Sequence, residues 1–100
     1  MIDFNITYPG HHFIKNCEVK RVHAPVRTDY PYTVIKTVQY ESLFYALRAC
    51  FHLTSLNPNH DMIDNGDAEA VKSYVKLVNS LLESKEGHDG SYFTFNGVKV

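Results

Sequence analysis

Four residues between positions 41 and 52 carry side chains that can act as acids or bases or bind anions. Glu41, Tyr45, Arg48 and His52 are spaced four, three and four residues apart. In an α-helix these spacings place all four side chains on one face. At the rim of a pocket, Arg48 could bind a phosphate-bearing ligand while Glu41 acts as an acid or base. On a solvated helix face, the same stripe would make only weak contacts.

The apolar residues between these positions define the helix that carries them. Residues 42–56 repeat apolar side chains at spacings of three and four, which predicts an amphipathic helix. Its predicted core residues are Leu43, Phe44, Leu47, Cys50 and Phe51. Cys50 and His52 do not form a nucleophile and base, because residues two apart on a helix do not face each other. We therefore expect Cys50 to be a small core residue.

A second helix is predicted from residue 67 to the glycine at position 87. Asp67 is a suitable N-cap, Glu69 suits the positive helix start, and Gly87 suits the C-terminal stop. One face collects the predicted core positions, which are Val71, Tyr74, Val75, Val78, Leu81 and Leu82.

Strands are predicted on both sides of the two helices. Alternating apolar and polar residues indicate strands over 2–8 and, less regularly, 12–24, and a β-branched run indicates a third over 32–39. Residues 24–31 contain two prolines and are expected to form a loop. At the end of the chain, residues 92–95 and 98–100 flank Asn96 and Gly97, the preferred hairpin turn.

Strands grouped before and after a pair of helices are typical of the α+β class. We expect an antiparallel sheet, made of three N-terminal strands and a C-terminal hairpin, packed on one face by two α-helices. The chain has 100 residues, 44% of them hydrophobic and 21% charged, which is typical of a globular domain. Residues 1–100 are therefore predicted to form one compact domain.

The charge of the chain argues against nucleic acid as its partner. The net charge is −1, with six Lys or Arg against four Asp or Glu in residues 1–50 and four against seven in residues 51–100. The basic residues of 15–27 are interrupted by Glu18 and are followed by Asp29. The sequence shows neither a membrane-spanning run nor a signal peptide, so we expect a cytoplasmic protein with reduced thiols.

The histidines and acidic residues do not form a recognisable metal motif. None of the six histidines pairs with another at a helical spacing of four, and Cys17 and Cys50 fit no metal spacing. Residues 61–72 resemble a calcium-binding loop only in part, because Ile63 and Lys72 occupy ligand positions that require oxygen. We predict neither a metal nor a cofactor.

The tyrosines favour a protein partner. Tyr30 and Tyr32 lie in the segment TDYPYT, and tyrosine is enriched at protein interfaces. The alternative is that they are ordinary half-buried residues of a sheet. Tyr30, Tyr32, Tyr45, Arg48 and His52 are the candidate binding residues.

The segment YESLFYALRA, residues 40–49, resembles the helix motif of the NADAR family, which typically reads V-E-H, three variable residues, A, one variable residue, K, A. Glu41, Ala46, Arg48 and Ala49 have the matching offsets, while Arg48 replaces the usual Lys and Ser42 the usual His. The chain has no Trp, so the family's Trp-containing segment has no counterpart. The family removes ADP-ribosyl groups or cleaves related N-glycosidic bonds. The resemblance implies that Glu41 serves the chemistry and Arg48 binds the phosphoribosyl part.

Two functional hypotheses remain open. In the first, the chain is a small intracellular binding or regulatory protein that docks on another protein, as phage-encoded inhibitors of host machinery do; it could also form homo-oligomers. In the second, it is a NADAR-like N-glycosidase acting on ADP-ribosyl or related phosphoribosyl substrates, with Glu41 and Arg48 as its catalytic pair.

Overall fold

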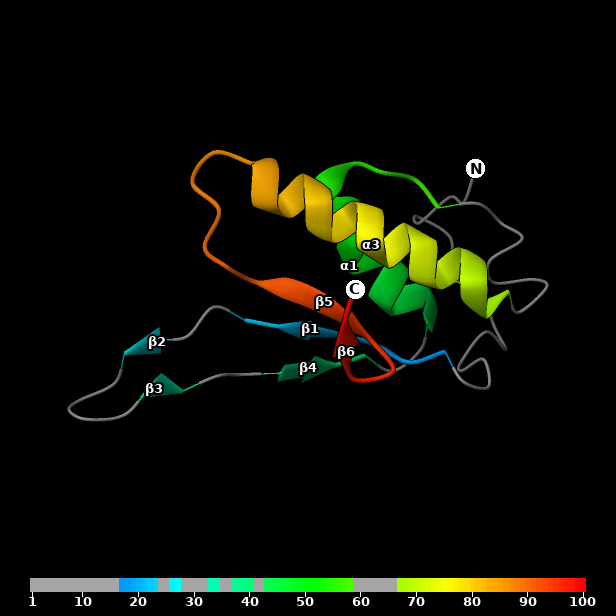
Figure 1. Cartoon of the computed structure of the whole chain (residues 1–100), viewed down its shortest axis with the longest axis horizontal. Coiled ribbons are helices and arrows are strands. Elements are labelled where there is room, and N and C mark those ends of the chain that lie inside the picture. The colour runs from blue at the N-terminus through cyan, green and yellow to red at the C-terminus, as the bar shows by residue number, and fades with distance from the viewer. Residues whose placement is uncertain (1–16, 24–25, 28–32, 35–36, 41–42, 59–66) are drawn as a thin grey trace.

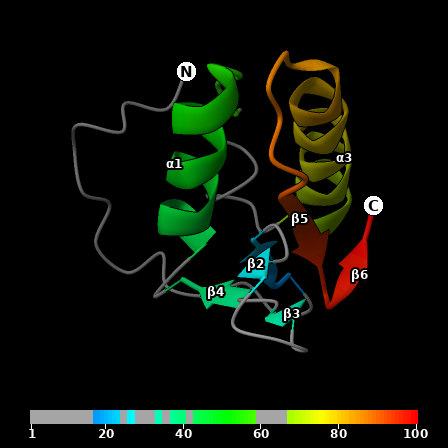
Figure 2. The ribbon, with the colours of Figure 1, turned by 90° about the vertical axis from the view of Figure 1, so that its left-hand side faces the viewer.

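Two helices lie side by side over one face of an antiparallel sheet (Figure 1). The computed structural model describes residues 17–23, 26–27, 33–34, 37–40, 43–58 and 67–100. The helices are α1 (Leu43–Thr54) and α3 (Ala68–Ser84). The view along the helices shows α1 above β4 and α3 above β5 and β6 (Figure 2). The α+β class and the one-sided helical layer are confirmed.

The main sheet has four strands in the order β4-β1-β5-β6. Their bounds are β1 (Val19–Val22), β4 (Thr37–Gln39), β5 (Tyr92–Phe95) and β6 (Val98–Lys99). The central strand β1 therefore lies between one strand that precedes the helices and one that follows them. This pairing joins the two ends of the described chain into one sheet.

A second, two-stranded sheet lies beyond the end of the first (Figure 1). It pairs β2 (Val26–Arg27) with β3 (Thr33–Val34), with Val26 opposite Val34. The prediction of a loop over 24–31 was therefore wrong at β2. Its two prolines, Pro25 and Pro31, lie outside β2 in sequence and remove no N–H group from its ladder. The strand predicted over 32–39 consists of β3 and β4, and the strand predicted over 2–8 lies outside the described residues.

The core lies between the sheet and the helices. In the register of the sheet, Val19 is opposite Phe95, and Arg21 is opposite Phe93 on one side and Val38 on the other. Directly opposed residues share a face, so these side chains lie beneath the helices. The buried apolar residues are Cys17, Val19, Leu43, Phe44, Ala46, Leu47, Cys50, Val71, Tyr74, Val75, Val78, Leu82 and Phe93.

Helix α1 ends before the Asn-Pro pair that was expected to stop it. Thr54 Oγ1 donates to the Cys50 carbonyl at 2.7 Å, and Ser55 follows with a φ of 60°. This left-handed residue turns the chain out of the helix. The core positions predicted for α1 are buried, except that Phe51 is only partly buried against the cluster.

Helix α3 begins as predicted and faces the core with one unexpected residue. Asp67 Oδ1 accepts a hydrogen bond from the Ala70 N–H at 3.1 Å, which confirms the N-cap. Leu81 was predicted to be buried, but it is 43% exposed, and Asn79 is buried instead. Asn79 faces inward because it binds the backbone of β5.

No helix in the described part of the chain is long and apolar enough to cross a membrane.

The C-terminal hairpin confirms the turn prediction. Asn96 and Gly97 have φ values of 51° and 81°, the left-handed pair that a two-residue hairpin turn requires. The turn is fastened to the segment before β1, because Asn96 N–H donates to the Glu18 carbonyl at 2.8 Å and Asn96 Oδ1 accepts from the Glu18 N–H at 2.8 Å.

Candidate functional site

Three of the four polar residues predicted to share one face of α1 are described by the structure. Arg48 and His52 are exposed and Tyr45 is half-buried. Arg48 Nε donates to His52 Nε2 at 3.4 Å, a long contact across one helical turn. Because arginine can only donate, His52 Nε2 is the acceptor in this contact. The structure thus brings Arg48 and His52 together as the spacing predicted.

Tyr45 links this exposed pair to the core. Its ring packs edge-to-face against Phe44, with ring centroids 5.5 Å apart and planes at 75°. It also contacts the buried cluster as a partly buried residue. Tyr45 therefore presents only part of its ring at the surface.

Glu41, which the enzymatic hypothesis requires, lies outside the described residues. Arg48 and His52 by themselves offer a guanidinium and an imidazole at an exposed helix surface. Such a pair can bind a carboxylate or a phosphate group through the N–H groups of Arg48.

The two cysteines are buried, as was expected for Cys50. Neither Cys17 nor Cys50 is in a disulfide. Burial raises the pKa of the Cys17 thiol to about 11 and raises the pKa of the Cys50 thiol as well. A thiol acts as a nucleophile in its thiolate form, which burial suppresses here.

Metal-ligating side chains are dispersed in the part of the chain that the structure covers. Within the described ranges, no group of three or more His, Cys, Asp or Glu residues could hold a metal ion. His11, His12 and His60 lie outside these ranges.

The candidate tyrosines of TDYPYT belong to the sequence between β2 and β3. Tyr30 and Tyr32 themselves lie outside the described residues. The two strands that flank them extend away from the helices, at the end of the long axis of the molecule (Figure 1). The molecule measures 46 Å along this axis and 26 by 24 Å across it. We call β2, β3 and the connecting residues 28–32 the arm.

Arg21 is a charged residue whose position the sequence analysis missed. It lies on the helix-covered face of β1, and no group in the described part of the chain forms a hydrogen bond with its buried Nε. Its alternation with Cys17 and Val19 could have indicated this face, but an arginine among apolar residues obscures the pattern.

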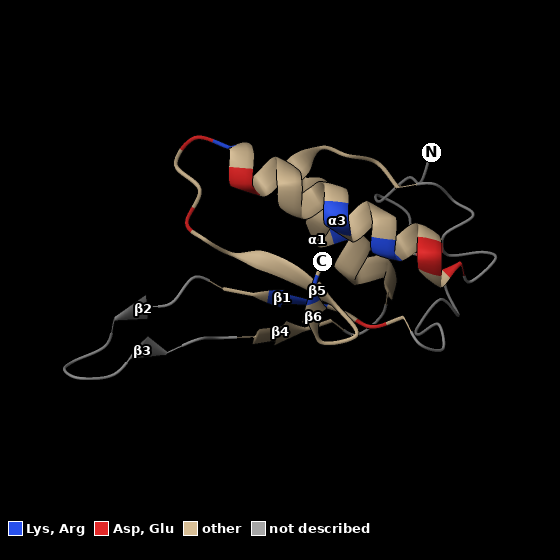
Figure 3. Ribbon diagram, viewed as in Figure 1, with Lys and Arg blue, Asp and Glu red and all other residues tan. Residues whose placement is uncertain are grey.

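Charged residues are spread over the body rather than gathered at the α1 stripe. Figure 3 shows basic positions in the middle of α3 and on β1, and acidic positions towards both ends of α3.

Asp89, in the loop after α3, accepts a hydrogen bond from the Ser91 N–H at 2.9 Å, which lowers the pKa of its carboxyl group.

Comparison with known proteins identifies no relative of this chain. No protein-family model, curated protein or solved structure matches the chain significantly.

Proposed function

We propose that this protein acts by docking on another protein through the arm. The observation that carries the proposal is the position of the β2–β3 ribbon, which extends beyond the helix-covered body (Figure 1). None of the described helices packs against it. A two-stranded ribbon alone is only marginally stable in water, so contact with a partner would stabilise it.

The composition of the arm supports a protein as the partner. Tyr30 and Tyr32 lie in the sequence between its strands, with Pro31 between them. Tyrosine offers a large contact area with few rotatable bonds, which lowers the entropy lost on binding. Among the described residues, β2 and β3 pair only with each other, so their outer edges can offer backbone groups for the partner to bind.

The exposed stripe of α1 is a second contact surface in this proposal. Arg48 is exposed, and Tyr45, three residues before it on α1, is partly buried against the core. Arginine and tyrosine are among the residues that dominate binding energy at protein interfaces. A small domain with these two surfaces can act by covering a site that its partner needs, as an intracellular inhibitor does.

The proposal is tested by site-specific photo-cross-linking in cells. A photoreactive amino acid is placed at position 30 or 32 in the arm, or at exposed Lys72 on α3 as the control. We expect a discrete adduct of one mass from the arm positions and none from position 72. Adducts of equal yield from all three positions, or none from the arm, would contradict the proposal.

Two variants then test the energetics with the captured partner. The double substitution Tyr30→Ser, Tyr32→Ser is expected to weaken binding at least about tenfold, as for the loss of interface hot spots. The matched control, Glu69→Ala with Lys72→Ala, removes two exposed α3 side chains and should bind like the wild type. Hydrolysis of an ADP-ribosylated substrate by the wild type, lost in Glu41→Ala with Arg48→Ala, would replace docking by the enzymatic function.

A further inference from the structure

The turn of the C-terminal hairpin presents an asparagine and the glycine that follows it at the surface. Asn96 and Gly97 are both exposed, and a side chain added at Gly97 would meet nothing within 4 Å. Asparagine is one of the thermally labile residues, because the backbone nitrogen of the next residue can attack its side-chain carbonyl carbon. A glycine in the next position has no Cβ to hinder this attack. The turn is therefore a reactive pair that water can reach.

The backbone of this turn is one peptide rotation away from the geometry of attack. The φ values are 51° at Asn96 and 81° at Gly97, positive at both as in a type I′ turn. Rotation of the single peptide between them gives a type II′ turn, which also closes a two-residue hairpin and keeps φ positive at Asn96. The first central residue then has a ψ of about −120°, which for an L-residue brings the next nitrogen to the same side as Cβ. Gly97 adopts the negative φ of this turn as readily as its present positive one.

The side-chain carbonyl of Asn96 is already held by a hydrogen-bond donor. Asn96 Oδ1 accepts from the Glu18 N–H at 2.8 Å, and the Asn96 N–H donates to the Glu18 carbonyl at 2.8 Å. An N–H directed at Oδ1 stabilises the negative charge that this oxygen gains when a nitrogen attacks its carbon. The two bonds join residues 78 positions apart, so a chemical change at Asn96 acts on a contact between distant parts of the chain.

We propose that Asn96 is a self-modification site, at which the folded chain converts its own asparagine into aspartate and isoaspartate. The Gly97 nitrogen loses its proton and bonds to Asn96 Cγ, the Cγ–Nδ2 bond breaks, and Nδ2 leaves as ammonia. Water then opens the cyclic imide at either of its two carbonyl groups. The net reaction consumes water, releases ammonia and replaces a neutral amide by a carboxylate, without an oxidant or a reductant.

The two products have different consequences for the hairpin. Aspartate at position 96 keeps a side-chain oxygen that can accept from the Glu18 N–H. Isoaspartate routes the main chain through the former side chain, which adds a methylene group to the backbone and removes that acceptor. A two-residue turn with a longer backbone no longer matches the pairing of β5 with β6. Isoaspartate formation therefore releases the turn from Glu18 and limits the lifetime of the folded state.

Peptide mass mapping of the full chain after incubation at mildly alkaline pH tests the reaction. The background is Asn65→Ser, which removes the other Asn-Gly pair of the sequence. We expect both aspartate and isoaspartate at position 96 in native buffer as well as in urea, and no ammonia release from that position in Asn96→Gly. Conversion in urea but none in the native protein would overturn the proposal, since the fold would then protect Asn96. Aspartate without isoaspartate would overturn the route through the imide.

The role of Gly97 is tested with Gly97→Ala in the same background. The added Cβ hinders the attacking nitrogen, so we expect slower conversion of Asn96 than with glycine. Alanine is strained at a φ of 81°, so circular dichroism checks that the variant is folded. The same comparison in urea, where the turn is absent, measures the effect of the Cβ if the variant unfolds. Equal rates with alanine and glycine in urea would overturn attack by the Gly97 nitrogen.

The consequence for the hairpin is tested on aged protein. Anion exchange separates the converted chains, which carry an additional negative charge, and urea unfolding compares a fraction rich in isoaspartate with Asn96→Asp. We expect the isoaspartate fraction to unfold at a lower urea concentration than Asn96→Asp, which should unfold close to the wild type. Equal midpoints for the isoaspartate fraction and Asn96→Asp would overturn the release of the turn from Glu18.

Discussion

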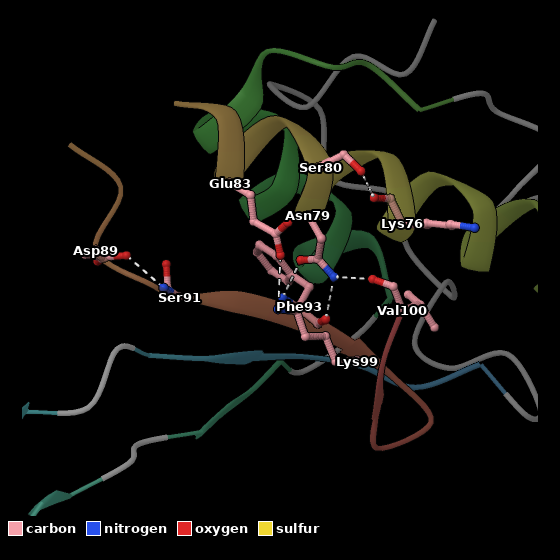
Figure 4. Close-up of polar contacts among 9 residues, drawn as sticks. All are labelled: Lys76, Asn79, Ser80, Glu83, Asp89, Ser91, Phe93, Lys99 and Val100. Carbon is pink, nitrogen blue, oxygen red and sulfur yellow. Dashed lines mark hydrogen bonds and ion pairs between the residues drawn. The ribbon is translucent and has the colours of Figure 1, made fainter. Parts of the chain in front are cut away.

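Asn79 of α3 and Phe93 of β5 are joined by two hydrogen bonds, as if the asparagine side chain were a neighbouring strand. Phe93 N–H donates to Asn79 Oδ1 at 2.8 Å, and Asn79 Nδ2 donates to the Phe93 carbonyl at 2.9 Å (Figure 4). The same Nδ2 donates to the Val100 carbonyl at 2.9 Å. The paired strand β6 ends at Lys99 and is matched to β5 only at Thr94 and Phe95, so Asn79 continues the ladder where β6 does not reach.

Replacing Asn79 should therefore weaken the whole fold. Asn79→Ala leaves the buried N–H and C=O groups of Phe93 without partners, and we expect it to lower the free energy of unfolding by about 2–4 kcal/mol. Ser80→Ala, at the adjacent exposed position, should change it by less than about 0.5 kcal/mol. Urea unfolding followed by circular dichroism measures both values. Equal stability of the two variants would show that the Asn79 bonds contribute little.

Val75 should be essential for the packing of α3 on the core. Its side chain is fully buried, and Val75→Asp would place an unpaired carboxylate among apolar residues at a cost of several kcal/mol. We expect the variant to lose its cooperative thermal transition. Lys72→Asp, on the exposed side of the same helix, should keep it. A sharp transition of Val75→Asp near the wild-type temperature would contradict the position assigned to Val75.

Alkaline pH should destabilise the fold through Cys17. Burial raises the pKa of this thiol from 9.0 to about 11. Between these pH values the unfolded chain has lost the thiol proton while the folded chain still holds it, so stability decreases as pH rises. The contribution is at most about 1.4 kcal/mol per pH unit. The stability is present below pH 9 and is lost as pH approaches 11.

The decline is measured by urea unfolding with a reductant between pH 8 and pH 10. Cys17→Ala removes the titrating group, so its unfolding free energy should fall less steeply with pH than that of the wild type. Parallel pH profiles for the two proteins would show that Cys17 titrates alike in the folded and unfolded states.

The hairpin turn should depend on Asn96 in two separable ways. Asn96→Gly keeps the left-handed backbone but removes the acceptor of the Glu18 N–H, which should cost about 1 kcal/mol. Asn96→Ala also strains the backbone at a φ of 51°, so we expect an additional loss of about 1 kcal/mol. Urea unfolding of both variants separates the cost of the lost hydrogen bond from the cost of the strained backbone. Equal stability of the two would mean that the left-handed φ at position 96 carries no cost for alanine.

Local chemistry explains why several elements were predictable. The left-handed pair Asn96 and Gly97 and the N-cap Asp67 act through residues within a few positions, so their conformations follow from short-range sterics and hydrogen bonds. Cys50 was predictable because its spacing from Leu43 and Leu47 repeats with the period of the helix. The same helical period predicted that the side chains of Arg48 and His52 share one face of α1.

Long-range contacts decided the remaining features. Asn79 is buried and Leu81 exposed because the unpaired edge of β5, fourteen residues away at Phe93, needs an amide partner at that point of α3. The position of Arg21 beneath the helices follows from the register of β1 against β4 and β5, which no local pattern specifies. The helical period determines which residues share a face, but the direction of that face depends on strands that meet it only in the folded chain.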